Sequence, residues 1–171
     1  VVHGAASGVG SAGLQVAKVM GARVIVTVRR DRDEARALGL GADHVVRTDD
    51  PDWSRHVRAL CPGGVHVVFE HIGGAAWDNS VRALQRGGRL VTCGATAGHE
   101  VTIDLRKIFF HSLELIGSTM GTRAELAQVL TLASRGALKP VIGAVLPLSR
   151  GAEAMGLLES REVFGKVVLE I

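Results

Sequence analysis

Residues 1–13, VVHGAASGVGSAG, carry the strongest structural signal in this chain. They contain a G-x-G-x-x-G at Gly8, Gly10 and Gly13, preceded by the end of an apolar strand and followed by a helical pattern. A strand, these glycines and a helix, in that order, are typical of a turn that holds the pyrophosphate of a dinucleotide.

Each glycine of this loop has its own expected role. Gly8 permits a tight turn with a positive φ, Gly10 lets the main chain approach a pyrophosphate, and Gly13 lets the helix pack close to the sheet. Free N–H groups and the helix dipole then favour an anion at the start of the helix. The alternative is a glycine-rich turn that binds nothing, and the second strand–helix unit that follows weighs against it.

The amino-acid composition limits which classes of protein this chain can belong to. The 171 residues are 47% hydrophobic and 22% charged, with a net charge of +3, which suits one globular domain. No apolar run reaches the ~20 residues of a membrane span, and dispersed basic residues with few aromatic ones predict no nucleic-acid partner. Val1 already lies inside a strand, so we expect a piece of a longer protein. Cys61 and Cys93 are expected to be buried thiols in a reducing cytoplasm.

Strands and helices alternate along the first two thirds of the chain. After the initial strand, further strands are predicted at 23–28, 44–46, 65–69, 89–93 and 113–118. Helices are predicted at 11–20 and 77–84, with one more that ends at residue 38 and another that begins at residue 51. This alternation predicts an α/β fold of the Rossmann type: a doubly wound, mostly parallel six-stranded sheet with helices on both faces. A C-terminal extension follows, with a helix at 125–134, a strand at 141–148, a helix at 152–158 and a strand at 166–171.

The end of the second strand indicates the type of cofactor. An NAD site usually has an acidic residue there that binds the adenosine ribose, but this chain has Val28 followed by Arg29 and Arg30. Guanidinium groups suit a phosphate dianion, so NADP(H) is favoured over NAD(H). The alternative is a solvated loop in which Asp31 or Asp33 neutralises the two arginines.

The chain resembles the medium-chain dehydrogenases/reductases, most of all their zinc-type alcohol dehydrogenase and quinone oxidoreductase branches. The resemblance covers essentially the whole chain and is carried by an ordered set of segments: VVHGAASGVGSAGLQVAKVMGARVIVTV, LGADHVV, GGVHVVFEHIGG, LQRGGRLVTCGATAG, LELIGSTMGTRAEL, LKPVIGAVLPL and FGKVVLEI. It implies an NAD(P)-dependent oxidoreductase that transfers hydride between nicotinamide and a small alcohol or aldehyde, or a quinone or enone.

The resemblance also implies two domains, of which residues 1–171 are the cofactor-binding half. A GroES-like catalytic domain, which holds zinc where zinc is present, would precede it, and residues 141–171 would return to that domain. The isolated chain is then expected to bind cofactor but to be inactive, with no catalytic or metal-binding residue of its own. A non-catalytic nucleotide-binding module on the same fold stays open as an alternative.

The resemblance assigns cofactor contacts residue by residue. The pyrophosphate loop of the family matches Ser7, Gly8, Val9 and Gly10, and its 2′-phosphate site matches Arg29 and Arg30. The nicotinamide side matches His71, Ile72 and Gly73 with Gly94, Ala95 and Thr96. The closing Gly-Lys of the family matches Gly165 and Lys166. Relatives often have a tyrosine near Thr48 beside the adenine, and this chain contains no tyrosine.

Glu70 and His71 allow a second interpretation. A similar pair occurs in the carboxylating enoyl-thioester reductases of the superfamily, where the histidine helps to hold carbon dioxide. Ile72 and Gly74 depart from that pattern, so a polar turn beside the nicotinamide ribose is preferred. Solvated or core-edge positions, without metal, are expected for the other histidines, at 3, 44, 56, 66, 99 and 111.

The resemblance finally suggests a homodimer. In family members the sixth strand, here Leu113–Ser118, often pairs with its mate in a second subunit. An unpaired apolar edge strand favours such pairing on physical grounds too.

Overall fold

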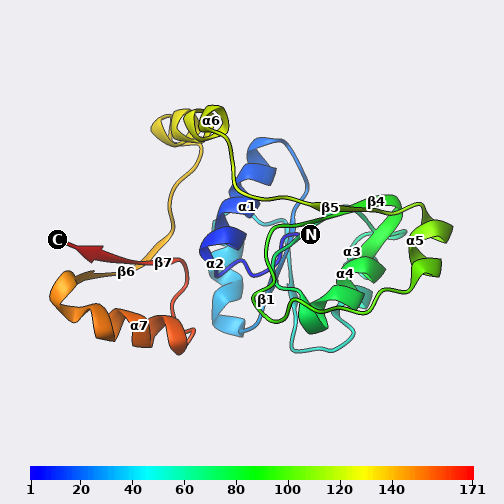
Figure 1. Cartoon of the computed structure of the whole chain (residues 1–171), viewed down its shortest axis with the longest axis horizontal. Helices are drawn as coiled ribbons and strands as arrows, with labels where there is room; N and C mark the ends of the chain where they lie inside the picture. The colour runs from blue at the N-terminus through cyan, green and yellow to red at the C-terminus, as the bar shows by residue number, and fades with distance from the viewer.

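The computed structural model describes all 171 residues and shows an α/β fold with parallel strands only (Figure 1). The strands form three hydrogen-bonded groups: β1 (Ile25–Val28) with β2 (His44–Arg47); β3 (Val65–Glu70) with β4 (Leu84–Thr92) and β5 (Glu114–Gly117); and β6 (Ile142–Pro147) with β7 (Lys166–Glu170).

Residues 1–3 join the first two groups. Val2 forms isolated parallel bridges with Val26 of β1 and with Phe69 of β3. Its amide N–H donates to the Ile25 carbonyl at 2.9 Å, and on the other side the Phe69 N–H donates to the Val1 carbonyl at 2.8 Å. The strand order is therefore β2, β1, residues 1–3, β3, β4, β5. The expected six regular strands are corrected to five, because a segment of three residues is too short to make a ladder of its own.

Helices cover both faces of this sheet, which confirms the doubly wound arrangement. α1 (Gly8–Val19) and α2 (Glu34–Gly39) pack on one face, and α3 (Trp53–Leu60) and α4 (Trp77–Ala83) pack on the other. Two apolar cores result. The first contains Val2, Ala5, Leu14, Val24, Val26, Val28, Ala37 and Ala42. The second contains Ile25, Val46, Trp53, Val57, Val65, Val68, Val81, Ala83, Leu84 and Leu90.

Several element boundaries differ from the sequence-based expectation. α1 begins at Gly8 rather than Ser11, because the Ser7 hydroxyl caps the helix by accepting the Gly10 N–H at 2.9 Å. The helix α5 (Leu105–His111) was not predicted, and the side chain of Asp104 caps it. β4 begins at Leu84, before the glycine turn, and its register with β3 shifts there. Three short 3₁₀ turns complete the chain at Asp31–Asp33, Gly74–Ala76 and Leu148–Arg150.

The last third of the chain forms a separate unit. Here α6 (Arg123–Ser134) precedes β6, α7 (Gly151–Glu159) and β7, and the β6–α7–β7 part stands to one side of the main sheet (Figure 1). Only Leu146, Ala154 and Phe164 are buried in it. The longest helices, α1 and α6, have 12 residues each, and none of the helices could cross a membrane.

The cysteines do not occupy the expected buried positions. Cys61 is half-buried and Cys93 is exposed. The prediction of two buried thiols was wrong because Cys93 follows the last residue of β4, where the chain leaves the sheet for a loop.

The second apolar core gives a stability prediction. Leu90 of β4 has a fully buried side chain, so Leu90→Ala should lower the free energy of unfolding by about 2–5 kcal/mol through lost contacts and a cavity. Leu126→Ala on α6, where the side chain is 58% exposed, is the matched control and should change it by less than ~1 kcal/mol. Urea denaturation measures both, and equal losses would contradict this placement of the core.

Candidate cofactor site

The turn before α1 differs in detail from the expected one. Gly8 does not have a positive φ. Gly4 does, with φ +58°, and the Ser7 N–H donates to the Gly4 carbonyl at 2.8 Å. The left-handed residue therefore lies four positions earlier than predicted. A Cβ at Gly8 would lie 2.2 Å from Cε of Lys166, so the lysine side chain packs against this position and would have to move for a larger residue.

Gly10 and Gly13 let α1 approach the sheet. A Cβ on Gly10 would lie 2.1 Å from the Gly4 carbonyl oxygen and 2.4 Å from that of His3, so no side chain fits. A Cβ on Gly13 would lie 2.9 Å from the Phe69 ring of β3. The close packing expected for Gly13 is confirmed, and Gly10 has a packing constraint that the sequence did not indicate.

The start of α1 is suited to an anion. The N–H groups of Gly8 and Val9 have no acceptor in the chain, whereas that of Gly10 is taken by Ser7. The side chain of Lys166 lies against Gly8, and the neighbouring Gly165 N–H donates to the Ala6 carbonyl at 2.7 Å. Two unpaired donors, a positive helix dipole and an ammonium group thus meet at one place.

Arg29 and Arg30 lie where β1 ends. Arg29 is exposed and forms neither an ion pair nor a hydrogen bond within the chain. Arg30 donates to the Ser160 carbonyl at 3.2 Å. The proposed neutralisation by Asp31 is not seen, because Asp31 pairs with Arg47 instead, and Asp33 forms no salt bridge.

The loops after β3 and β4 are fastened to each other. The Ala97 N–H donates to the Ile72 carbonyl at 2.7 Å, and the Gly74 N–H donates to the Gly98 carbonyl at 3.0 Å. Thr96 approaches the His71 carbonyl through both its N–H and its hydroxyl. The structure therefore brings together the two predicted groups on this side, which are His71, Ile72 and Gly73, and Gly94, Ala95 and Thr96.

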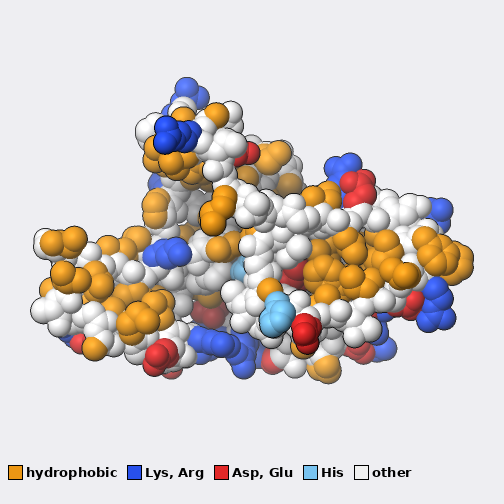
Figure 2. Space-filling model, in the orientation of Figure 1, with side chains coloured by type: hydrophobic (Ala, Val, Ile, Leu, Met, Phe, Trp, Pro, Cys, Tyr) orange, Lys and Arg blue, Asp and Glu red, His pale blue; other side chains and the backbone are white.

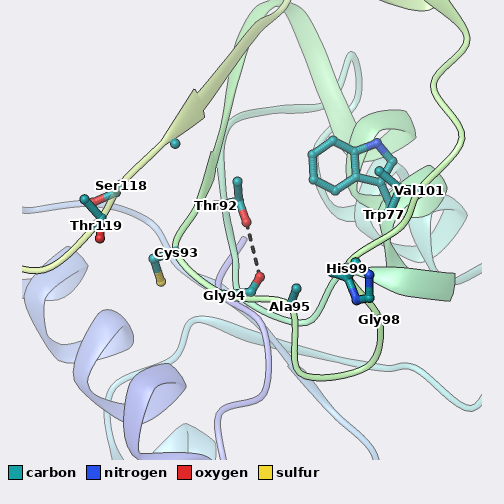
Figure 3. A pocket seen from close by; sticks show the side chains of 12 residues that line it. Trp77, Thr92, Cys93, Gly94, Ala95, Gly98, His99, Val101, Ser118 and Thr119 are labelled. Carbon is teal, nitrogen blue, oxygen red and sulfur yellow. Dashed lines mark hydrogen bonds between the residues drawn. The ribbon is translucent and has the colours of Figure 1, made fainter.

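A cavity of about 590 Å³ opens beside these loops, at the carboxyl ends of β4 and β5. Figure 3 shows Cys93, Ser118 and Thr119 on one side of it, with Trp77 and His99 on the other. The Thr92 hydroxyl donates to the Gly94 carbonyl at 3.3 Å and holds the turn between them. Carboxyl ends of parallel strands are where open α/β sheets bind ligands.

A buried carboxylate shapes the loop after β3. Glu70 is fully buried, and its Oε1 accepts the N–H groups of Ile72 at 2.5 Å and Gly73 at 2.9 Å. Burial alone would raise the pKa of Glu70, but a charge on His3, when that ring is protonated, and the hydrogen bonds from Ser80, Gly73 and Ile72 lower the pKa. Glu70 is therefore an ionised anchor for this turn.

His71 and His3 occupy neighbouring buried positions. The Nε2 of His71 lies 2.9 Å from the His3 carbonyl oxygen, so this nitrogen donates inside the protein. His3 is completely buried, and burial lowers its pKa to about 4. A solvated or core-edge position for His3 was thus wrong. No local pattern marks it, because its side-chain partners Thr27 and Ser80 lie 24 and 77 residues away.

The glycine loop, the end of β1 and the two loops together fit a dinucleotide, with anion donors at one end and a cavity at the other. The residues of this chain do not fit a zinc site, since no three His, Cys, Asp or Glu side chains gather in a metal-binding arrangement.

Comparison with known proteins agrees with this geometry. The chain is 29% identical over 171 residues to a protein named acryloyl-coenzyme A reductase from Sulfurisphaera tokodaii, covering 99% of this chain and 50% of the relative. A crystal structure described as an NAD-dependent alcohol dehydrogenase matches with a TM-score of 0.93 and 42% identity, covering 99% of this chain and 50% of the other. The 2-octenoyl-CoA carboxylase reductase CinF, in complex with NADP and 2-octenoyl-CoA, matches with a TM-score of 0.90 and 30% identity over 98% of this chain and 42% of the other.

The chain thus spans about half the length of the relatives it matches. Residues 8–135, which include the glycine loop, both arginines and the two fastened loops, match the family described as zinc-binding dehydrogenase. The protein belongs to the zinc-binding dehydrogenase family, of which this chain carries the nucleotide-binding fold.

Proposed function

We propose that the chain is the NADP(H)-binding half of an oxidoreductase. The observation that carries this proposal is the pair of unpaired N–H groups of Gly8 and Val9 next to the Lys166 side chain. These groups would hold the pyrophosphate, with Ser7 and Gly10 fixing the start of the helix and Gly165 fixing the lysine.

Arg29 supports the preference for NADP(H) over NAD(H). Its guanidinium group follows β1 directly and has no acidic partner, so it is available to a 2′-phosphate. Arg30 would assist from the same turn. No carboxylate side chain at the tip of β1 would repel that phosphate, because Val28 ends the strand.

His71, Ile72 and Gly73, with Gly94, Ala95 and Thr96, would orient the nicotinamide half beside the cavity. Bound nicotinamide supplies the hydride chemistry, and the protein supplies binding and orientation. The substrate would be a small alcohol or aldehyde, or a quinone or enone, polarised by the other half of the protein. A cytoplasmic setting suits the exposed free thiol of Cys93.

An enoyl-thioester reductase, simple or carboxylating, is the second candidate, and the likeness to acryloyl-coenzyme A reductase and CinF favours it. A carbon dioxide site at His71 has less support, because its Nε2 is engaged by the His3 carbonyl and Glu70 is used inside its own turn. Carboxylated product from the longer protein, with NADPH, an enoyl thioester and bicarbonate, would reverse this preference.

The cofactor proposal is tested by titrating the chain with NADPH and NADH and following nicotinamide fluorescence. The wild type should bind NADPH more tightly. Replacing Arg29 and Arg30 by alanine should weaken NADPH binding by about tenfold or more, since each charge-assisted hydrogen bond to phosphate contributes about 1.5–3 kcal/mol. NADH binding should change little.

Arg23→Ala is the matched control, because Arg23 is exposed and contacts His44 and the Leu60 carbonyl away from the site. Equal losses of NADPH and NADH binding in the double variant would remove the NADP preference. Failure of the wild type to bind either cofactor would contradict the proposed function.

We also propose a homodimer through Leu113–Ser118. β5 pairs with β4 on one side only, and its four residues are exposed. Hydrophobic side chains gather at the end of the molecule where α5 lies (Figure 1 and Figure 2), and Leu105, Phe109 and Phe110 of α5 are exposed.

Sedimentation at micromolar concentration should give a dimer, and Ile116→Lys on β5 should give a monomer, since a charge on an edge strand opposes pairing. Leu126→Lys on α6, where the side chain is also exposed, should leave the dimer intact. A wild-type monomer would contradict the proposed interface.

A further inference from the structure

A chain of buried polar side chains crosses the main sheet. Thr27 of β1, His3, Ser80 of α4 and Glu70 of β3 are each no more than 1% exposed. His3 Nδ1 lies 3.1 Å from Thr27 Oγ1, His3 Nε2 lies 2.9 Å from Ser80 Oγ, and Ser80 Oγ lies 2.7 Å from Glu70 Oε2. None of these four residues was assigned to the cofactor site.

Only one direction of donation satisfies this chain. Oε1 of the Glu70 carboxylate accepts two backbone N–H groups, and Oε2 must accept the Ser80 proton. The Ala76 carbonyl also lies 2.9 Å from the Ser80 hydroxyl, but the hydroxyl has one proton and does not donate it there. If it did, Ser80 Oγ and the carboxylate would face each other with no hydrogen between them. With its proton used, Ser80 Oγ accepts from His3 Nε2.

The tautomer of His3 follows from this direction. Nε2 carries the proton, so Nδ1 accepts from the Thr27 hydroxyl, and Thr27 Oγ1 in turn accepts the Gly4 N–H at 3.0 Å. A neutral ring is what the depressed pKa of His3, about 4, requires near neutral pH.

The two ends of this hydrogen-bond chain of side chains hold two different parts of the cofactor site. One end fixes Gly4, whose positive φ turns the main chain toward the glycine loop. The other end fixes the Ile72–Gly73 turn, which is tied through Ala97 and Gly98 to the loop after β4. Four side chains thus set the separation between the pyrophosphate end and the nicotinamide end.

We propose that His3 and Glu70 are positioning residues that hold the loop at 71–73 in register with the glycine loop, so that the nicotinamide half of the cofactor is bound in a fixed place. This inference rests on the proposed function. Neither residue would touch the cofactor, and the competing explanation is a polar cluster that only stabilises the fold.

Selectivity for one half of the cofactor separates the two explanations. Glu70→Gln keeps the shape of the side chain but removes its charge and places an NH2 group opposite the Ser80 hydroxyl. The bond from Ser80 is then lost and those from Ile72 and Gly73 lose their charged acceptor, so NADPH binding should weaken by about tenfold. Adenosine 2′,5′-bisphosphate carries only the adenine half, and its affinity should stay within about twofold of the wild type. Isothermal titration calorimetry measures both ligands.

The double replacement of Arg29 and Arg30 by alanine is the matched control and should weaken both ligands. If Glu70→Gln weakens both ligands equally, or neither, the positioning role is wrong while the proposed function stands. If the wild type binds neither ligand, the proposed function fails and the positioning role fails with it. Ser80→Ala, which removes the hydroxyl between His3 and Glu70 but leaves the Glu70 turn bonded, replaces Glu70→Gln if that variant unfolds, and it should show the same selective loss.

The tautomer supplies a readout that needs no variant. Nitrogen-15 NMR of the wild type at neutral pH should show His3 protonated at Nε2 and unprotonated at Nδ1. A ring protonated at Nδ1, or at both nitrogens, would overturn the direction of the hydrogen-bond chain and the proposal with it.

Discussion

The burial of one ionised carboxylate, that of Glu70, is the constraint on which the ligand-facing edge of this sheet depends. A charge removed from water must be compensated at both oxygens, and the fold does this with two backbone N–H groups on one side and the Ser80 hydroxyl on the other. The first requirement bends the chain sharply after β3. The second draws α4 and His3 against the same point. The geometry of the loop after β3 and the packing of α4 therefore both follow from the need to hydrogen-bond the two oxygens of the buried Glu70 carboxylate.

In the glycine loop, too, one set of residues meets two structural requirements. Two of its three motif glycines are also required by packing, because a side chain at Gly10 or Gly13 would collide with the main chain or with Phe69. The helix begins at Gly8 because the Ser7 hydroxyl caps it, and the N–H groups of Gly8 and Val9 are left without acceptors in the chain. At Gly10 and Gly13, core packing therefore requires the same residue type that the proposed anion site would require. Gly4, outside the motif, supplies the left-handed turn.

Much of the fold and the location of the site could be predicted from the sequence, because both follow from local patterns. Alternating strands and helices and the glycine spacing indicated the sheet and the edge at which the candidate site lies. Long-range effects could not be predicted. His3 is buried by partners far away in the sequence. α5 was missed because LRKIFFH has no clear apolar period, and Cys93 was misplaced because strand ends are hard to locate from pattern alone.

The contact between Lys166 and Gly8 has a consequence for the C-terminal unit. β7 begins at Lys166, and the unit touches the main body through few polar contacts, among them the one from Gly165 to Ala6. An anion that fixes the lysine would also restrict the strand that carries it. Thermodynamic linkage makes this coupling reciprocal. A surface that covers β6 and β7 and restrains the lysine therefore changes the affinity of the protein for the anion. The anion changes the affinity of the protein for that surface by the same factor.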